Sequence, residues 1–451
     1  MRKLSNSFKL KSFRELYNSV NNLSLLNINN YYAHTSNDKE PEKLFDHLQL
    51  VIKYFFCIID ANQLESLIDN AIKNIQISKD KFIDEEFANI IKHFFFESIF
   101  FHDIGKINEN FQYKKMKNPS FHSEIDNGLG SDHSLLSSYI FFHYSIKKLN
   151  KINGYEQFIS FYFLLLLCLS ISRHHSSFLS DFFEEKIIAD DNAYLNNLLQ
   201  KLNITKIFLD FDLNKICEHQ EFLNSVKSLS DETAFILFLL TKLNYSLLTA
   251  SDYYATFNYK NSLDNDILIK DFGILSDELK NRIYNNFYTK KGYNKNLKDK
   301  TDLNDFNSLS IKSLENLNLL RENLAIEIKQ NILKNYNKNL FYIEAPTGSG
   351  KTNLALLCIT ELLQKRKELN KIFFVLPFIT LITQTRDAII NTFDLSQNEI
   401  IDFHSKTGLH FKNSNDYDSI KFDYIDYLFL NYPITLLSHI TFFDILKSNS
   451  K

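Results

Sequence analysis

The chain has 451 residues, of which 44% are hydrophobic and 23% charged, and its formal net charge is −3 at neutral pH. This composition excludes a disordered or fibrous protein and a uniformly basic nucleic-acid binder, although a local basic channel stays compatible with it. The length predicts two or three domains with full hydrophobic cores. Because only 9 glycines and 5 prolines interrupt the chain, we expect helices to dominate at least its first half.

The cysteines, the N-terminal segment and the longest apolar run indicate in which cellular compartment the protein is expected. The 4 cysteines are scattered without C-x-x-C spacing, so they predict buried, reduced thiols. The basic segment Met1–Arg14 has no apolar segment behind it and does not predict a secretory signal peptide. The apolar run Phe158–Ile171 has about 14 residues, whereas a bilayer span needs about 20. We therefore expect a cytoplasmic protein without a membrane partner.

Residues 1–262 are predicted to form one all-α domain. Apolar residues recur there at helical spacing, with few glycines or prolines between them. The segments that show this pattern are Leu44–Ile59, Phe87–Phe101, Leu135–Leu149, Phe158–Ile171 and Ala234–Thr249.

A change of composition separates this domain from the rest of the chain. Residues 263–315 are rich in Asn, Lys and Asp, with weak periodicity, which predicts a connector with some helix. From residue 316 to residue 451, helical and strand-like segments alternate, as in a parallel α/β sheet. The expected elements are helix Leu317–Tyr336, strand Leu340–Glu344, helix Asn353–Lys367, strand Lys371–Leu376 and helix Thr380–Phe393.

The loop after the first of these strands carries a phosphate-binding pattern. Its sequence, over residues 345–352, is Ala-Pro-Thr-Gly-Ser-Gly-Lys-Thr. In such a loop, backbone N–H groups point at phosphates, the lysine pairs with the β- and γ-phosphates, and the last hydroxyl ligates Mg²⁺. The pattern predicts that ATP and Mg²⁺ bind through Gly348, Ser349, Gly350, Lys351 and Thr352.

A second group of chemically active residues lies far upstream. His102 and Asp103 are adjacent at the end of an aromatic helical segment. A single histidine on an apolar face is more often structural than a ligand, but a cluster favours metal binding. An imidazole beside a carboxylate suits Mn²⁺, Fe²⁺, Co²⁺, Ni²⁺ or Mg²⁺, whereas a closed structural Zn²⁺ site would favour thiolates. Further imidazoles and a carboxylate are offered by His47, His133, His174, His175 and Asp252.

This pattern resembles the HD metallohydrolase superfamily, whose signature is a histidine, an adjacent His-Asp pair and a distal aspartate, all on helices. With the phosphate loop, the chain resembles the CRISPR-associated HD nuclease fused to a superfamily 2 helicase in type I interference. The resemblance extends from about residue 30 to the end. In the first half it is carried by Tyr32–Thr35, Phe45–Leu48, Asn108–Gln112, Asp132–Ser134 and Arg173–His175. In the second half it is carried by Glu344–Thr352 and by Val375–Phe378 with Gln384.

The resemblance implies a metal-dependent nuclease that degrades single-stranded DNA exposed by a guide-RNA surveillance complex, in antiviral defence, with an ATP-driven motor. His102 and Asp103 would form the catalytic pair. Lys106, about one helical turn later, would steady the scissile phosphate, the alternative being a solvated lysine at a helix start. His34 lies in an opening motif but matches the ligand position less well than His47. The implied metal ligands are His47, His102, Asp103, His133, His174, His175 and Asp252.

The motor half lacks one expected element. No Asp-Glu pair follows an apolar strand after Thr352, although such motors use that pair to complete Mg²⁺ coordination. Asn431–Thr435 resembles the segment of the first motor lobe that precedes this acidic pair. We therefore expect an incomplete RecA-like lobe, and a separate chain would have to supply the rest of a helicase.

A natural split, a frameshifted product and an incomplete reading frame would each explain this gap. Two further functions stay open at this point. The first is an HD-type phosphohydrolase that acts on small nucleotides. The second is a non-catalytic remnant that binds DNA or the surveillance complex.

Overall fold

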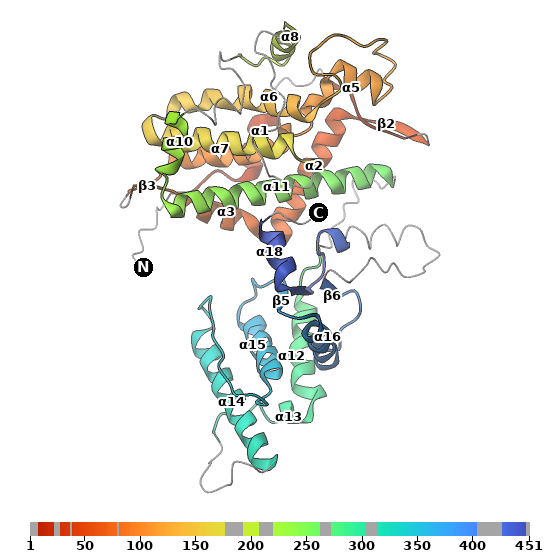
Figure 1. The fold of residues 1–451 in the computed structure, drawn as a ribbon. Helices are drawn as coiled ribbons and strands as arrows, with labels where there is room; N and C mark the ends of the chain where they lie inside the picture. Colours follow the sequence, from red (N-terminus) through yellow and green to blue (C-terminus); the bar gives the residue numbers. More distant parts are fainter. Residues whose placement is uncertain are drawn as a thin grey trace. The chain divides into compact units, whose positions relative to one another are not determined.

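The computed structural model describes residues 8–21, 28–36, 38–78, 81–175, 193–206, 220–261, 272–303, 314–403 and 426–447. The chain divides into two compact units, Met1–Lys270 and Asp271–Ser450, apart from the last residue. Described residues of both units are mainly helical, and those of the second also include a parallel sheet (Figure 1).

The first unit is a bundle of helices that pack through their apolar faces (Figure 1). Helix α2 lies along α11, and α7 contacts α4, α6 and α11. Phe94, Phe95 and Phe96 of α4 are fully buried, so the aromatic run seen in the sequence forms core. The helices are α1 (Phe13–Asn21), α2 (Leu44–Asn62), α3 (Leu64–Lys73), α4 (Glu85–Phe101), η2 (Ile104–Ile107), α5 (Glu109–Lys114), α6 (Ser134–Ser145), η3 (Ile146–Lys151), α7 (Gly154–Ser172), α8 (Ala193–Lys201), α10 (Gln220–Lys227) and α11 (Asp231–Lys260).

All five apolar segments predicted as helices are helical, but the expectation of an all-α domain needs a correction. Two antiparallel hairpins lie in this unit: β1 (Tyr32–Ser36) with β2 (Lys39–Lys43), and β3 (Gln76–Ser78) with β4 (Lys81–Phe82). The first hairpin has a physical reason, because Pro41 disfavours a helix in the second of its strands. Its register places His34 opposite Glu42.

Two helices, α7 and α11, are long and apolar enough to cross a membrane when judged by length and composition. In the first unit, α7 is enclosed by three other helices, and 56% of its apolar window is buried. This environment is typical of a core helix.

The second unit combines helices with a three-stranded parallel sheet of order β5-β7-β6. Ile372 of β5 and Ile400 of β6 both lie opposite Ile434 of the central strand. The core joins that strand to α15 and α16 through buried Leu357, Phe393 and Leu436. The elements are α12 (Asp277–Lys290), α13 (Gly292–Lys295), α14 (Leu314–Asn335), α15 (Lys351–Lys365), β5 (Ile372–Leu376), α16 (Ile379–Phe393), β6 (Ile400–Phe403), β7 (Ile434–Ser438) and α18 (His439–Lys447).

The strand expected before the phosphate loop does not form. Leu340–Glu344 has no regular structure, and no described strand pairs with it. Leu340 and Tyr342 are 87% and 86% exposed. A strand is stabilised by hydrogen bonds to a neighbouring strand, so an apolar alternation without such a neighbour does not become one.

The expected connector, residues 263–315, belongs in part to the second unit. Its described central part forms α12 and α13, and Ile283 and Phe287 of α12 are fully buried in the core of that unit. The Asn- and Lys-rich composition made helix α12 hard to recognise in the sequence, because only one face of this helix is apolar.

Candidate metal centre and nucleotide site

The end of α4 carries the adjacent His-Asp pair. The imidazole of His102 donates from Nδ1 to the Ile99 carbonyl at 2.9 Å. Its Nε2 is therefore the nitrogen with a free lone pair. Asp103 leaves the helix at φ −114° and ψ 5°, just before η2. Both residues are fully buried, so this turn directs an imidazole nitrogen and a carboxylate into the interior.

Gly105 sets the distance between this turn and α6. Its N–H donates to Ser137 Oγ at 2.8 Å, and a Cβ on this glycine would lie 2.0 Å from the His133 carbonyl oxygen. Only glycine allows so close an approach. His133, the N-cap residue of α6, consequently reaches Asp103, with Nε2 at 3.4 Å from Oδ1.

Helices α2, α11 and α7 bring the next three side chains. His47, buried on α2, has Nε2 at 3.3 Å from Asp103 Oδ2 and at 3.2 Å from Asp252 Oδ1, which α11 provides. His174 follows α7 and donates from Nδ1 to the Ile171 carbonyl at 2.6 Å. Its Nε2 lies 3.4 Å from Asp103 Oδ1.

The cluster consists of two adjoining groups that share Asp103, and the ligand atoms within each group lie within 4.8 Å of one another. The inner group, entirely buried, is His47, His102, Asp103 and Asp252. The outer group, in which the last residue is exposed, is Asp103, His133, His174 and His175. Because Asp103 turns Oδ2 toward the first group and Oδ1 toward the second, it is placed to bridge two ions. The structure thus brings together all seven residues named as implied ligands.

The donor set fits divalent cations. Oδ2 of Asp103 is ion-paired with Lys106 Nζ at 2.7 Å. Nε2 of His47, His102 and His174 and Oδ1 of Asp103 are buried and form no hydrogen bond among the described residues. Such an atom costs about 1–3 kcal/mol when left unpaired. The distances from these nitrogens to the Asp103 and Asp252 oxygens are 3.2–3.7 Å. Neighbouring ligands around an ion bonded at about 2.1 Å lie about 3.0–3.5 Å apart.

Lys106 is part of this cluster. Its side chain is only 4% exposed, and its Nζ lies 2.7 Å from Asp103 Oδ2, so the alternative of a solvated lysine does not fit. Burial alone would raise the pKa of the Asp103 carboxyl, but Lys106 and the neighbouring imidazoles hold that pKa well below its ordinary value. Burial would lower the pKa of His47, but the carboxylates of Glu42, Asp103 and Asp252 raise it well above its ordinary value.

His34 lies beside the cluster. Its Nδ1 is 2.6 Å from Glu42 Oε2, and its Nε2 is 3.3 Å from Lys106 Nζ. Sequence reasoning missed Glu42, the partner of His34. Its only signal in the sequence is a carboxylate five positions before His47, where the strand gives way to the helix.

Two buried amides in the Asn108–Gln112 motif hold the loops around the cluster. Asn108 donates from Nδ2 to the Asp132 carbonyl at 2.7 Å, next to His133. Gln112 donates from Nε2 to the carbonyls of Lys106 and Tyr32, at 2.7 and 2.8 Å. The motif was recognised from the sequence, but these positioning roles were not.

In the second unit, the phosphate loop leads directly into α15. Gly348 and Gly350 adopt φ of +82° and +83°, a backbone conformation that favours glycine. Ser349 between them is buried, and Lys351 and Thr352 are exposed in the first turn of the helix. The five predicted nucleotide-binding residues therefore lie at one helix N-terminus, where backbone N–H groups are free to bind phosphate.

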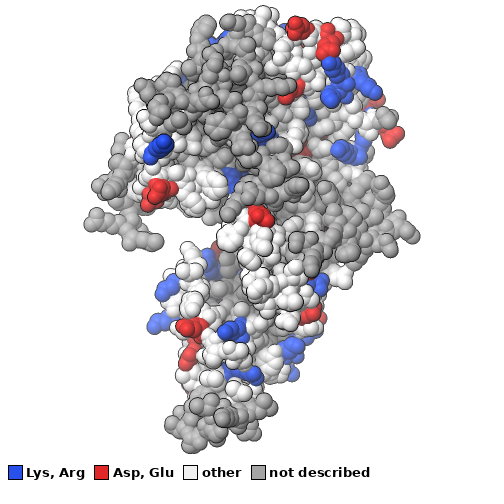
Figure 2. Space-filling view, in the orientation of Figure 1, with Lys and Arg blue, Asp and Glu red and all other residues white. Residues whose placement is uncertain are grey.

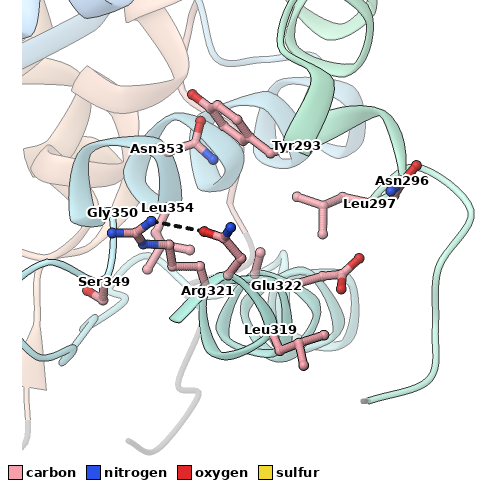
Figure 3. A pocket seen from close by; sticks show the side chains of 12 residues that line it. Tyr293, Asn296, Leu297, Leu319, Arg321, Glu322, Ser349, Gly350, Asn353 and Leu354 are labelled. Carbon is pink, nitrogen blue, oxygen red and sulfur yellow. Dashed lines mark hydrogen bonds between the residues drawn. The ribbon is translucent and has the colours of Figure 1, made fainter. Parts of the chain in front are cut away.

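A cavity of about 800 Å³ adjoins this loop. Figure 3 shows Tyr293 and Asn353 on one side and α14 on the other, with the guanidinium of Arg321 near the loop. Arg321 donates from Nε and Nη2 to the Gly348 carbonyl, at 3.0 and 2.8 Å. The volume is that of a typical small-molecule site.

Residues 274–433 match the family model described as type III restriction enzyme, res subunit. This part of the chain is a superfamily 2 helicase-like lobe. The match includes α12, so the lobe begins before residue 316, where the sequence pattern had placed its start. A helicase-like lobe implies binding of ATP and Mg²⁺, in keeping with the phosphate loop. A search of curated proteins and a search of solved structures each found no match to the chain.

Charged side chains of both signs are interspersed on the described parts of the face in Figure 2. This face is therefore not a continuous basic surface, as the net charge of −3 also indicates.

Proposed function

We propose that this chain is a metal-dependent nuclease that hydrolyses phosphodiester bonds in single-stranded DNA, joined to an ATP-binding, helicase-like lobe. One observation carries the proposal. Residues from His47 to Asp252, distant in sequence, converge on Asp103, and several of their donor atoms are buried and form no hydrogen bond among the described residues. A cluster of this kind is typical of metal-assisted hydrolysis.

A bound divalent cation would polarise the phosphodiester and supply a water of lowered pKa. His47, His102 and Asp252 would hold one ion, and His133, His174 and His175 a second, with Asp103 between them. Since Lys106 is buried and paired with Asp103, we assign it to the orientation of that carboxylate rather than to contact with the scissile phosphate. A polymeric substrate would approach from the outer group, where His175 is exposed.

The helicase-like lobe supports a substrate that is moved along its backbone rather than read by sequence. On this basis, and on the resemblance of the sequence motifs, we propose a role in type I CRISPR antiviral defence in the cytoplasm. A guide-RNA surveillance complex would expose the strand.

The test is cleavage of circular single-stranded DNA with Mn²⁺, Co²⁺ or Ni²⁺ and without ATP. Wild type is compared with Asp103→Asn, and with Asp46→Asn, which changes an exposed carboxylate on α2 next to a ligand. We expect cutting by wild type and Asp46→Asn and none by Asp103→Asn. Equal cutting by all three would refute the assignment, and hydrolysis of free nucleotides alone would favour a nucleotide phosphohydrolase.

A further inference from the structure

We propose that Glu42 is a positioning residue that holds both His47 and His34 for the metal centre. This inference rests on the proposed function. It concerns a carboxylate outside the ligand set, contributed by the β1–β2 hairpin rather than by the helices that carry the ligands.

A pattern common to the buried ligand histidines motivates it. His102 and His174 each donate from Nδ1 to the carbonyl three residues earlier, which fixes the ring and leaves Nε2 for an ion. His47 lies within α2, where carbonyls are used by the helix itself, and it has no such anchor. The charged group that faces its Nδ1 is instead Glu42, whose Oε2 lies at 3.3 Å, an ion-pair contact rather than a hydrogen bond.

The same oxygen serves a second ring. His34 lies opposite Glu42 in the hairpin, and its Nδ1 is 2.6 Å from Oε2. A proton on that nitrogen leaves Nε2 of His34 as an acceptor for the Lys106 ammonium, at 3.3 Å. Lys106 in turn pairs with Asp103. Glu42 is therefore connected to the cluster on two sides, through a ligand and through the lysine that orients the bridging carboxylate.

The hairpin is held firmly enough to give this carboxylate a fixed position. Gln112 both donates to the Tyr32 carbonyl and accepts from the Tyr32 N–H, at 2.8 and 2.9 Å. The ring of His34 stacks on Tyr259 of α11, with centroids 6.0 Å apart. The first contact ties the hairpin to α5, and the second ties it to α11, which also carries Asp252.

His34, Glu42 and His47 also lie close enough to form a metal group of their own. We favour positioning because a lysine ammonium next to His34 Nε2 opposes a third cation there. The charge on Glu42 is consistent with its role as an acceptor. Burial would raise its pKa, but the two histidines lower it to about 2.

The experiment is Mn²⁺ binding to full-length Glu42→Gln, followed by electron paramagnetic resonance, with the visible spectrum of bound Co²⁺ as a report on ligand geometry. The control is Glu40→Gln, the same change at an exposed position of the same strand. We expect Glu42→Gln to bind Mn²⁺ at least about 10-fold more weakly, as is usual when a ligand loses its outer partner, and to change the Co²⁺ spectrum. The control should match wild type.

Unchanged affinity and an unchanged Co²⁺ spectrum in Glu42→Gln would overturn the inference. If that variant does not fold, Glu42→Asp replaces it, since it keeps the charge but shortens the reach. Weaker Mn²⁺ binding by Glu42→Asp would support the inference, and wild-type binding would overturn it. Failure of wild type itself to bind Mn²⁺ would instead refute the proposed function.

Discussion

The two sites of this chain differ in how far the fold builds them. In the first unit, the candidate ligand atoms are part of the core: His47, His102 and Asp103 are fully buried, and a hydrogen bond to the Ile99 carbonyl fixes the His102 ring. In the second unit, Lys351 and Thr352 are exposed, and the segment before the phosphate loop has no strand partner among the described residues. The candidate metal centre is thus preorganised, whereas the nucleotide site is open.

This difference has an energetic meaning. A preformed ligand cluster binds an ion without ordering new segments, and ion binding then adds to the stability of the folded state. The exposed phosphate loop lacks this preformed arrangement, and a nucleotide must itself order the residues around it when it binds. We therefore expect the metal chemistry to proceed without ATP and the nucleotide chemistry to depend on further elements.

The largest expected effect separates the two sites. Asp252→Asn removes a ligand of the inner group and should reduce DNA cutting at least about 100-fold, more than loss of an outer partner costs. It should leave ATP binding unchanged. Lys351→Ala should instead weaken ATP binding and leave DNA cutting unchanged, because the Lys351 ammonium pairs with nucleotide phosphates. Cleavage assays without ATP and titration with a fluorescent ATP analogue measure both, and loss of both activities in either variant would contradict the comparison.

The next effect tests how the first site is built. Gly105→Ala should destabilise the first unit by about 2–3 kcal/mol, because its Cβ would overlap the His133 carbonyl and force η2 away from α6. Gly292→Ala, at a position with open space around it, should change stability by less than about 0.5 kcal/mol. Urea unfolding measures both variants. Equal stability of the two would show that the close approach is unimportant.

A smaller effect concerns pH. The pKa values of His47 and His174 are raised, since nearby carboxylates outweigh burial. In the metal-free protein these rings keep their protons at and above the ordinary pKa of about 6.5, and an ion must displace them. Mn²⁺ affinity should therefore rise between pH 6 and 8. Calorimetry in two buffers of different ionisation enthalpy would detect that release; an affinity that falls with pH would contradict it.

The smallest effect lies at the open site. Arg321→Ala removes two hydrogen bonds to the exposed Gly348 carbonyl, worth about 1 kcal/mol, and should weaken ATP binding about 5-fold. Lys334→Ala, at an exposed position of the same helix, is the control. DNA cutting without ATP should be unchanged in both. A phosphate loop that is preorganised without Arg321 would instead give equal ATP affinities.

Local patterns explain what the sequence predicts well. His102 and Asp103 are adjacent, the phosphate loop is contiguous, and α2 and α4 show helical spacing, so each could be recognised within a short window. The candidate ligands named from the family resemblance do converge in the structure, as expected if short motifs can be recognised in the sequence. The prediction of a strand at Leu340–Glu344 was wrong because a strand forms only beside a neighbouring strand, and no local pattern reveals whether one is there.

The residues that sequence analysis missed act through contacts between distant segments. Gln112 belongs to a recognised motif, but its positioning role depends on Tyr32, 80 positions away, and Glu42 gains its partners only when the hairpin folds onto α2. Neither has a composition or spacing that distinguishes it from other polar residues. Gly105 likewise owes its importance to α6, whose approach the sequence does not encode locally.

Anomalous diffraction at the manganese edge, from crystals of the full chain grown with Mn²⁺, tests the central claim most directly. The account predicts a peak about 2.0–2.3 Å from His47 Nε2, His102 Nε2 and carboxylate oxygens of Asp103 and Asp252. A second peak is expected beside His174, across Asp103. Manganese bound elsewhere, with these side chains left unliganded, would contradict the account.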